Sequence, residues 1–566
     1  MNQEVYNADR WRRIYYEFHT NATGGGARGC IALITTLGAT TYQTQYATFM
    51  ANEIDADMLL LQSEFEYTWY DRSSPTYTSA YGAICTEANG NEFDATIIEL
   101  AFHDDPIDAK LLRDPRVRAA MARSSVQGIV RFLNWMPSSP IPLAFAPDVP
   151  RNVRVVDAGN GDVTLSWIAP LSDGARGDPA TGYVIYQSTN GYGFGDPIVL
   201  GNVLTHTISG VSAGETRYYR IAATNAGGES MPSEVLAVRR PATGVANVLI
   251  VNGFDRLRRQ QNYVQTFLFP PAYAGLTPER QIWRRSNSYD YVVQHAEAMA
   301  TALPTYGFSS CANEAVSDGN ILLDDYAVVV WICGEESTED ATLSATEQTK
   351  LTAFLTNSGG LLLTGSEIGY DLDNQAHGVT FYETKLKSNF VANDAGTYAA
   401  TGTAGGILSD IGAFDFSPAN GAPYDADLPD QIAPQTGAQA ALSYVGGTGG
   451  TAAVQYTSAC NRYRVVTFGF PFEVITSATV RADLMERVIP WLADTAGVLP
   501  FDTNNDCDVD LADYSIFRIC LEQSGPNKPL STGHVCIATY AMDRDGDRDI
   551  DLQEFALFQE VFTGAL

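Results

Sequence analysis

Residues 94–115, DATIIELAFHDDPIDAKLLRDP, indicate the fold class of the N-terminal part of this chain. A β-branched apolar run predicts a buried strand, and a carboxylate, Glu99, lies near its end. An acidic cluster follows, after which Asp114 and Pro115 supply an N-cap and a first-turn proline for a helix. Strands that alternate with helices are typical of α/β domains, so residues 1–136 are predicted to form one.

Two further segments of this domain have clear patterns. The run MLLLQSEF, residues 58–65, is predicted to be a strand. Residues 116–135 are predicted to be a helix with one apolar face. The side chains expected on that face are Val117, Met121, Val126, Ile129, Val130 and Leu133.

Composition excludes some partners. The 566 residues include 66 acidic and 35 basic side chains, which gives a net charge of −31. That charge argues against nucleic acid or an anionic membrane as a partner, and no apolar run is long enough to span a bilayer. The first 13 residues have no apolar core and are not a secretory signal. Of the eight cysteines, Cys520 and Cys536 flank a loop and are a plausible disulfide pair.

The middle of the chain divides into a linker and two domains. Prolines mark residues 137–147 as an extended linker. Short strands separated by Gly, Asp and Asn turns predict a β-sandwich over residues 148–241. With Trp167 on an early strand and YYRIAATNAGGES following, this segment resembles a fibronectin type III domain, which implies that Tyr218 or Tyr219 is the corner tyrosine. Such a domain is expected to be a spacer, with a sugar-binding platform as the alternative.

Residues 245–495 return to α/β alternation with near-continuous apolar strands, which predicts a parallel sheet covered on both faces. The order resembles a flavodoxin-like or class I glutamine-amidotransferase-like sheet. Cys333 lacks the glycine-flanked elbow of the amidotransferase enzymes and is interpreted as a buried structural cysteine. Glu335, Glu336 and Glu367 follow strands at the edge where α/β ligands bind, so they indicate either a ligand crevice or solvated strand ends.

The C-terminal segment, residues 498–566, contains two acidic twelve-residue loops. Calcium prefers six to eight oxygen ligands, and EF-hand loops supply them from positions 1, 3, 5, 7, 9 and 12. The predicted ligands of the first loop are Asp502, Asn504, Asp506, the backbone carbonyl of Asp508, Asp510 and Asp513. Those of the second loop are Asp543, Asp545, Asp547, the backbone carbonyl of Asp549, Asp551 and Glu554. Position 6, usually glycine, is Cys507 in one loop and Arg548 in the other, which strains the turn.

Paired loop–helix units of this kind resemble a dockerin. The resemblance implies two calcium ions, export to the cell surface or beyond, and a cohesin-like protein module as partner. Many dockerins contact the cohesin through Ser-Thr at positions 10 and 11, whereas this chain has Leu511-Ala512 and Leu552-Gln553. The resemblance therefore implies the calcium-binding fold of the dockerins, but it does not imply which partner this module binds.

A second stretch near the N-terminus, WRRIYYEFHTNATGGGARG at residues 11–29, ends a strand-like run at His19. Together with residues 94–115 it resembles the zinc-dependent N-acetylmuramoyl-L-alanine amidases of bacterial cell walls. The resemblance implies that His19 is a zinc ligand and Glu99 the catalytic carboxylate. The residues that follow the catalytic glutamate in the family's motif are matched here by Phe102, Asp105, Asp108, Ala109 and Leu112. Ala101 stands where the family usually has a glycine.

The resemblance leaves the zinc site incomplete, because a catalytic zinc needs about three protein ligands. Only 18 residues precede His19, with no other histidine among them, and neither Glu4 nor Glu17 falls in the expected strand-and-helix context. His103 is a candidate substitute ligand. We therefore expect either an N-terminally truncated domain or one that has lost catalysis.

The chain is thus predicted to be a multidomain protein: an incomplete α/β amidase-like domain, a β-sandwich, a flavodoxin-like α/β domain and a small α-helical EF-hand pair. The expected function is a secreted peptidoglycan amidase-like hydrolase that is weakly active or inactive in this chain. Two alternatives stay open. One is a non-enzymatic extracellular protein that binds glycan or a scaffold through its tail, and the other is a parent enzyme that acts on a different polysaccharide.

Overall fold

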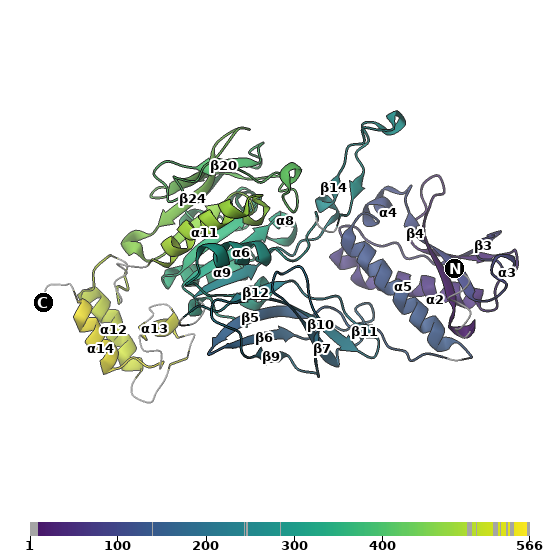
Figure 1. Ribbon diagram of the computed structural model, residues 1–566, viewed down its shortest axis with the longest axis horizontal. Helices are drawn as coiled ribbons and strands as arrows, with labels where there is room; N and C mark the ends of the chain where they lie inside the picture. The colour runs from purple at the N-terminus through teal and green to yellow at the C-terminus, as the bar shows by residue number, and fades with distance from the viewer. Residues whose placement is uncertain are drawn as a thin grey trace.

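The structure, a computed structural model, is an elongated multidomain chain with the N-terminal and C-terminal units at opposite ends (Figure 1). It describes residues 10–562 apart from 139, 243, 245–246, 283–284, 495–500, 505, 525–529, 532–533, 539–541 and 544–547. None of the described helices is both long and apolar enough to cross a membrane.

The N-terminal unit is a four-stranded sheet in the order β1-β4-β2-β3. Strands β1 and β4 run parallel, as do β2 and β3, whereas β2 and β4 are antiparallel. The strands are β1 (Ile14–Asn21), β2 (Ile31–Thr35), β3 (Thr76–Ser79) and β4 (Asp94–Phe102). Successive side chains of β4 point to opposite faces of the sheet. Ile98 packs in the cluster that includes the helices, whereas Ala95 and Ile97 pack in a second apolar cluster on the other face.

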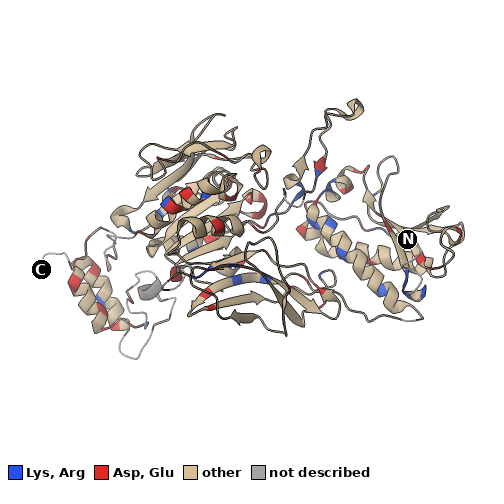
Figure 2. Cartoon of the chain, in the orientation of Figure 1, with Lys and Arg blue, Asp and Glu red and all other residues tan. Residues whose placement is uncertain are grey.

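Two long helices, α2 (Gln43–Leu61) and α5 (Pro115–Trp135), pack on one face of this sheet (Figure 1). Asp114 caps α5 by accepting from the Arg116 N–H at 2.9 Å. Arginines recur along α5 and are marked in blue in Figure 2. The short elements of the unit are η1 (Arg10–Arg12), η2 (Gln62–Glu64), α3 (Thr86–Asn89) and α4 (Pro106–Leu111).

Two predictions for this unit are wrong. Residues 58–65 begin as the last turn of α2 and continue into η2, because Met58 and Leu61 pack with the helical core rather than in a sheet. Val126 is 59% exposed. Small side chains occupy the centre of the α5 contact face instead, and a Cβ added at Gly128 would lie 3.0 Å from the Met50 sulfur of α2.

The middle segment is a β-sandwich. One sheet contains β5 (Arg151–Gly159), β6 (Asp162–Ile168) and β9 (Thr205–Ile208). The other contains β7 (Gly182–Ser188), β8 (Ile198–Leu200), β10 (Thr216–Asn225), β11 (Gly228–Glu229) and β12 (Leu236–Arg239). Trp167 lies between the sheets with its ring centroid 5.2 Å from that of Tyr183, and Tyr218 and Tyr219 are both buried.

The large α/β domain is built on five parallel strands in the order β16-β13-β17-β18-β25. They are β13 (Val248–Asn252), β16 (Phe308–Ala312), β17 (Val328–Gly334), β18 (Gly360–Gly365) and β25 (Arg464–Phe468). In chain order this arrangement is 2-1-3-4-5, so the strand order reverses between β13 and β17. Gly334 ends β17 at φ +49°, where an added Cβ would lie 2.2 Å from the Phe254 ring.

Helices cover both faces of this parallel sheet. One face packs on α6 (Val292–Ala302) and α11 (Ala478–Ala493), and the other on α7 (Asn313–Ser317) and α9 (Ala345–Thr356). Ser344 caps α9 in a capping box with Glu347. Two further helices are α8 (Ser337–Asp340) and α10 (Val379–Thr384), and the short turns are η3 (Arg259–Gln261), η4 (Pro271–Tyr273), η5 (Leu323–Asp325), η6 (Tyr370–Asn374), η7 (Pro418–Asn420), η8 (Ala459–Asn461) and η9 (Phe472–Val474).

An antiparallel extension joins the sheet beyond β25. It contains β19 (Ser388–Ala392), β20 (Ala399–Gly402), β21 (Phe414–Asp415), β22 (Gln431–Pro434), β23 (Gln439–Tyr444) and β24 (Thr451–Thr457). Separately, the hairpin of β14 (Tyr263–Val264) and β15 (Glu279–Arg280) projects from the domain toward the N-terminal unit (Figure 1).

The sandwich and the α/β sheet are continuous at one edge. Strand β16 pairs with β5 and, at one residue, with β12. The Ser310 hydroxyl donates to the Ala237 carbonyl at 2.6 Å, and the Asp157 N–H donates to the Ser309 hydroxyl at 3.1 Å. The sandwich therefore covers the outer edge of β16, which would otherwise present unpaired backbone groups.

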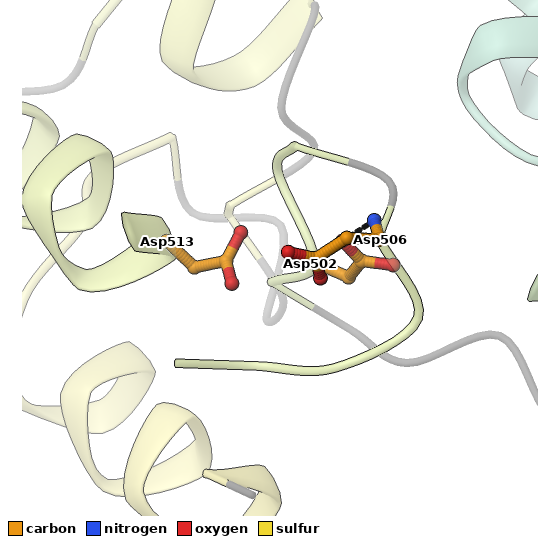
Figure 3. Close-up of side chains that lie close together, drawn as sticks. All are labelled: Asp502, Asp506 and Asp513. Carbon is orange, nitrogen blue, oxygen red and sulfur yellow. Dashed lines mark hydrogen bonds between the residues drawn. The ribbon is translucent and has the colours of Figure 1, made fainter. Parts of the chain in front are cut away.

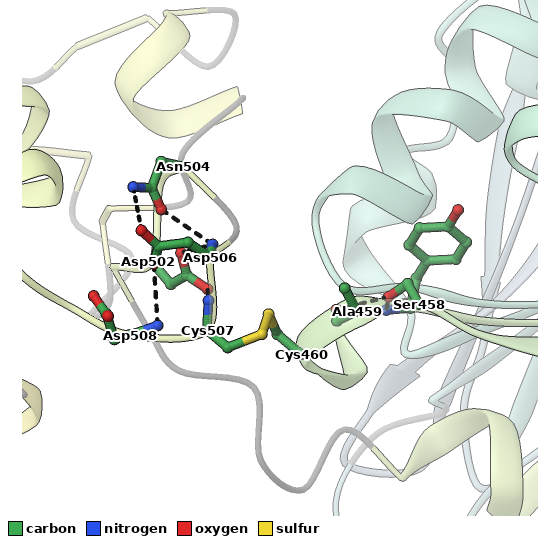
Figure 4. The surroundings of a disulfide bond; sticks show 9 residues. Ser458, Ala459, Cys460, Asp502, Asn504, Asp506, Cys507 and Asp508 are labelled. Atoms are coloured by element: carbon green, nitrogen blue, oxygen red, sulfur yellow. Dashed lines mark hydrogen bonds between the residues drawn. A yellow bond between two sulfur atoms is a disulfide. The ribbon is translucent and has the colours of Figure 1, made fainter. Parts of the chain in front are cut away.

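The C-terminal unit contains α12 (Leu511–Gln523), α13 (Val535–Ala538) and α14 (Leu552–Val561), and Asp and Glu residues occur on α12 and α14 (Figure 2). A disulfide joins Cys520 to Cys536, the pair indicated by the sequence. A second disulfide, which the sequence analysis did not predict, joins Cys507 to Cys460 in the turn before β25 (Figure 4). This bond ties the first acidic loop to the α/β domain.

Candidate functional site

His19 and Glu99 lie side by side at the carboxyl ends of two neighbouring strands. The parallel pairing of β1 and β4 places the two residues directly opposite each other. Opposed residues of adjacent strands project from the same face of the sheet. The sequence motifs 80 residues apart therefore meet on the sheet face that lies away from α2 and α5.

The Glu99 carboxyl is in an unusual environment for an acid. Glu99 is 9% exposed, and its Oε2 has no hydrogen-bond partner among the described residues. Burial raises the pKa of Glu99 above its usual value, while the imidazoles of His19 and His103 act in the opposite direction. A carboxyl in such a setting can take up and release a proton closer to neutral pH than a solvated one.

The donors around His19 do not complete a catalytic zinc site. The His19 Nε2 lies 3.3 Å from a Glu17 oxygen, and the His103 Nδ1 lies 3.0 Å from the Thr20 hydroxyl. No group of three nitrogen, sulfur or carboxylate donors converges here among the described residues. Since a catalytic zinc takes about three protein ligands, the described donor set does not fit one. Glu4 lies outside the described residues.

Acidic residues after β4 hold the glycine-rich loop that follows β1. One Asp104 oxygen accepts from the N–H groups of Thr23, Gly24 and Gly25, each at 2.8 Å, and these bonds lower the pKa of Asp104. A cluster of backbone N–H groups around one carboxylate cannot be inferred from residue types alone.

Two of the residues that match the family's motif after Glu99 have structural roles. The Asp105 side chain caps α4 by accepting from two backbone N–H groups, and Asp108 is fully buried. The Asp108 carboxylate accepts from Arg28 at 2.8 Å and from the Gly29 N–H at 2.9 Å. Asp108, which also accepts from the Phe102 N–H, thus fixes the loop that follows His19 relative to β4, and the Asp105 carboxylate lies 3.4 Å from the same Arg28 side chain.

A second candidate site lies at the carboxyl ends of the parallel strands in the α/β domain. Glu335 and Glu367 line a cavity of about 420 Å³. Glu336 does not line it; this buried side chain accepts from the N–H groups of Asp255 and Arg256 at 2.6 and 2.7 Å. Two of the three predicted crevice carboxylates therefore face one cavity, and the third supports its wall.

Among the described residues of the α/β domain, no cysteine pairs with a histidine. Cys333 is buried in the core, and burial raises the pKa of its thiol well above the usual value. The His377 Nδ1 lies 2.6 Å from an oxygen of Asp371 instead. Because a thiolate is the reactive form, this cysteine is not arranged as a nucleophile.

In the first acidic loop, Asp502, Asp506 and Asp513 bring carboxylate oxygens within 4.8 Å of one another (Figure 3). Asp508 and Asp510 form a second such group with Asp513. Hydrogen bonds also hold the loop, and the Asn504 amide donates to Asp506 at 2.7 Å (Figure 4). Such a set of hard oxygen donors suits a calcium ion.

The second loop is described in part. Asp549, Asp551 and Glu554 converge within 4.8 Å, whereas Asp545 and Asp547 lie outside the described residues. At position 6, Cys507 has φ +74° and Arg548 has φ +68°. The position 8 residues of the two loops are both fully buried in one core: Val509 and Ile550.

Comparison with known proteins identifies one of the domains. The model of the fibronectin type III family matches residues 148–239, which confirms the prediction for the β-sandwich. A Kelch domain-containing protein of Saccharolobus solfataricus is 36% identical over 93 residues, which are 16% of this chain and 12% of that protein. The chain thus spans a small part of that relative's length.

Solved structures give the same type of match. The sixth fibronectin type III domain of human fibronectin type III domain containing protein 3 is 25% identical, with a TM-score of 0.16, over 18% of this chain and 90% of that one. The FN5 domain of Drosophila Lar is 20% identical, with a TM-score of 0.15, over 17% of this chain and all of that one.

Proposed function

We propose that the N-terminal unit is an amidase-like domain that acts on bacterial peptidoglycan, at the amide bond between N-acetylmuramic acid and L-alanine. The observation that carries this proposal is the pairing of His19 with Glu99 at the ends of β1 and β4. Both residues come from motifs that resemble the zinc-dependent amidases, and the two motifs meet in space.

Glu99 is the residue proposed to move protons. Its buried carboxyl, with a raised pKa and one unpartnered oxygen, is suited to accept a proton from an attacking water and to pass it to the leaving amine. The described donors around His19 do not fit a three-ligand zinc. The proposal therefore includes weak or no peptidoglycan turnover by this chain.

The test is the release of new amino termini from purified peptidoglycan. Residual turnover is expected to fall by about 10²–10⁴-fold in Glu99→Gln, since general acid–base catalysis contributes that much. Glu87→Gln, which changes an exposed glutamate on α3, is the matched control. If the Glu99→Gln variant turned peptidoglycan over as fast as the Glu87→Gln control, Glu99 would not be the proton-transferring residue.

For the C-terminal unit we propose two bound calcium ions and a dockerin-like role in attachment to a cohesin-like module. The converging carboxylates of both loops and the shared core around Val509 and Ile550 support this assignment. A module of this type implies a secreted or cell-surface protein. Direct pull-down with candidate cohesin modules, with and without calcium, tests the partner.

The incomplete donor set around His19 favours one alternative: an extracellular protein that binds a cell-surface glycan without cleaving it. Sedimentation with peptidoglycan separates the two proposals. The alternative predicts binding that is unchanged by Glu99→Gln and no released amine from any polymer. A parent enzyme for another polysaccharide would instead release reducing ends from a different substrate.

A further inference from the structure

The tip of the β14–β15 hairpin, residues 268–277, is an exposed apolar surface. Every residue of the tip is exposed, and its largest apolar side chains are Leu268 at 86%, Phe269 at 78%, Tyr273 at 56% and Leu276 at 55%. The hairpin projects from the α/β domain, and the tip lies at its far end (Figure 1). Single exposed apolar side chains are ordinary, but a contiguous group of them marks an interaction site.

The base of the hairpin is fixed by charged contacts with the N-terminal unit. Arg113 pairs with Glu279 at 2.8 Å, and Arg259 pairs with Glu66 through two bonds of 2.7 and 2.9 Å. The Asn262 amide also donates to the Arg113 carbonyl at 2.7 Å. These contacts hold the hairpin in its projecting position.

The backbone of the tip is hydrogen-bonded to itself. The Phe267 N–H donates to the Leu276 carbonyl, and the Gly275 N–H donates to the Phe267 carbonyl, both at 2.9 Å. At the turn, the Tyr273 N–H donates to the Pro270 carbonyl at 2.9 Å. The exposed side chains are therefore displayed by an ordered turn.

These bonds also decide which surroundings the tip can enter. The N–H groups of residues 273–276 all donate within the hairpin, and Pro270 and Pro271 have no N–H. A partner that adds a strand needs free backbone donors and acceptors along an edge. Hydrocarbon forms no hydrogen bonds, so a backbone that enters it must satisfy its polar groups internally. The turn therefore fits an apolar medium better than a strand-pairing partner.

Charge is distributed unevenly around the tip. The chain has 66 acidic residues, but none lies between residues 256 and 278. Beside the tip, the guanidinium of Arg280 lies 5.5 Å from the centroid of the Phe267 ring, and that of Arg285 lies 5.0 Å from the Tyr263 ring. Arginines and aromatic rings next to an apolar segment are typical of chains that lie at the headgroup level of a bilayer. The net charge of −31 opposes an anionic bilayer, so a zwitterionic one fits best.

From these observations we propose that the hairpin tip inserts into the surface of a zwitterionic phospholipid bilayer. Leu268, Phe269 and Tyr273 enter the boundary between headgroups and acyl chains, while Arg280 stays among the phosphate groups. From the Val264–Glu279 pair to Pro270 the strand spans roughly 20 Å, more than twice the Debye length of about 8 Å at physiological salt. The acidic body of the protein is thus screened from the bilayer. The proposal does not rest on the function proposed for His19 and Glu99.

The test is sedimentation of the full chain with phosphatidylcholine vesicles at physiological and at high salt. The wild type is expected to sediment with the vesicles in both, because salt does not screen the burial of apolar side chains. Leu268→Asp and Phe269→Asp should each lower the partition coefficient about tenfold or more, since a buried Leu or Phe side chain contributes at least that much. Met231→Asp, which changes a side chain that is 62% exposed in the sandwich, is the matched control and should sediment as the wild type does.

Four results would overturn the proposal. One is the absence of sedimentation with phosphatidylcholine vesicles. Another is equal sedimentation of the wild type and both tip variants, with circular dichroism showing that the variants are folded. The third is binding only to vesicles that contain phosphatidylglycerol, with loss of that binding at high salt, which would show an electrostatic contact. The fourth is a dimer in vesicle-free solution that Phe269→Asp abolishes, which would show that a second copy of the chain covers the tip.

Discussion

Removal of calcium is expected to unfold the C-terminal unit selectively. The first loop contains five carboxylates, and Asp513 and Glu554 are 0% and 1% exposed. Without a cation, these buried acids face other carboxylates at close range.

The size of the effect follows from linkage. At a free calcium concentration one hundred times the Kd, each site stabilises the folded state by about 2.7 kcal/mol, so two sites contribute about 5 kcal/mol. That is comparable to the entire stability of a small domain, about 5–15 kcal/mol. A domain of this size should lose about 20 °C or more in Tm.

Limited proteolysis followed by mass spectrometry measures this change region by region. With chelator, new cleavage sites should appear within residues 501–562 and not in the sandwich, and added calcium should remove them. Asp513→Asn should reproduce the pattern in the presence of calcium, whereas Asp483→Asn on α11 should not. An identical cleavage pattern with and without chelator would refute the calcium assignment.

Three further predictions concern stability. Replacing Cys460 and Cys507 by serine opens a bridge between residues 47 apart in sequence and should lower the free energy of unfolding by about 4 kcal/mol, measured by urea titration of the C-terminal unit. Trp167→Ala should cost about 3–5 kcal/mol in urea unfolding of the sandwich, because the ring is buried in its core. Burial raises the pKa of Glu234 to about 8 and also raises that of Asp255, so the native state holds protons that the unfolded state has released. The stability of the sandwich and the α/β domain, which meet at Glu234 and Asn252, should therefore fall as pH rises from about 4 to about 8, with a shallower slope in Glu234→Gln, and an unchanged slope in that variant would contradict the assignment.

Local chemistry made several features predictable. The caps at Asp114 and Ser344 are side-chain hydrogen bonds to nearby N–H groups, so a few adjacent residues are sufficient to indicate them. Trp167 and the alternating strands predicted the sandwich, which the family comparison confirms. His19 and Glu99 could be named from their motifs, but their register across β1 and β4 could only be seen in three dimensions.

Features that depend on distant contacts were missed. Residues 58–65 read as a strand because a short apolar run does not distinguish a strand from the end of a buried helix. The Cys460–Cys507 bridge crosses two domains, and its one sequence signal is a cysteine where the loop usually has glycine. The cavity takes Arg256 and Asn262 from a long segment without periodicity, so no pattern predicted their proximity to Glu335.

Metal content after purification in trace zinc and calcium tests the account most directly, because both metal proposals depend on it. The account predicts about two calcium ions per chain, consistent with the two loops, and less than one zinc, with the zinc that does bind lost in His19→Ala. One zinc per wild-type chain, zinc that persists in His19→Ala, or a chain without calcium would each contradict it.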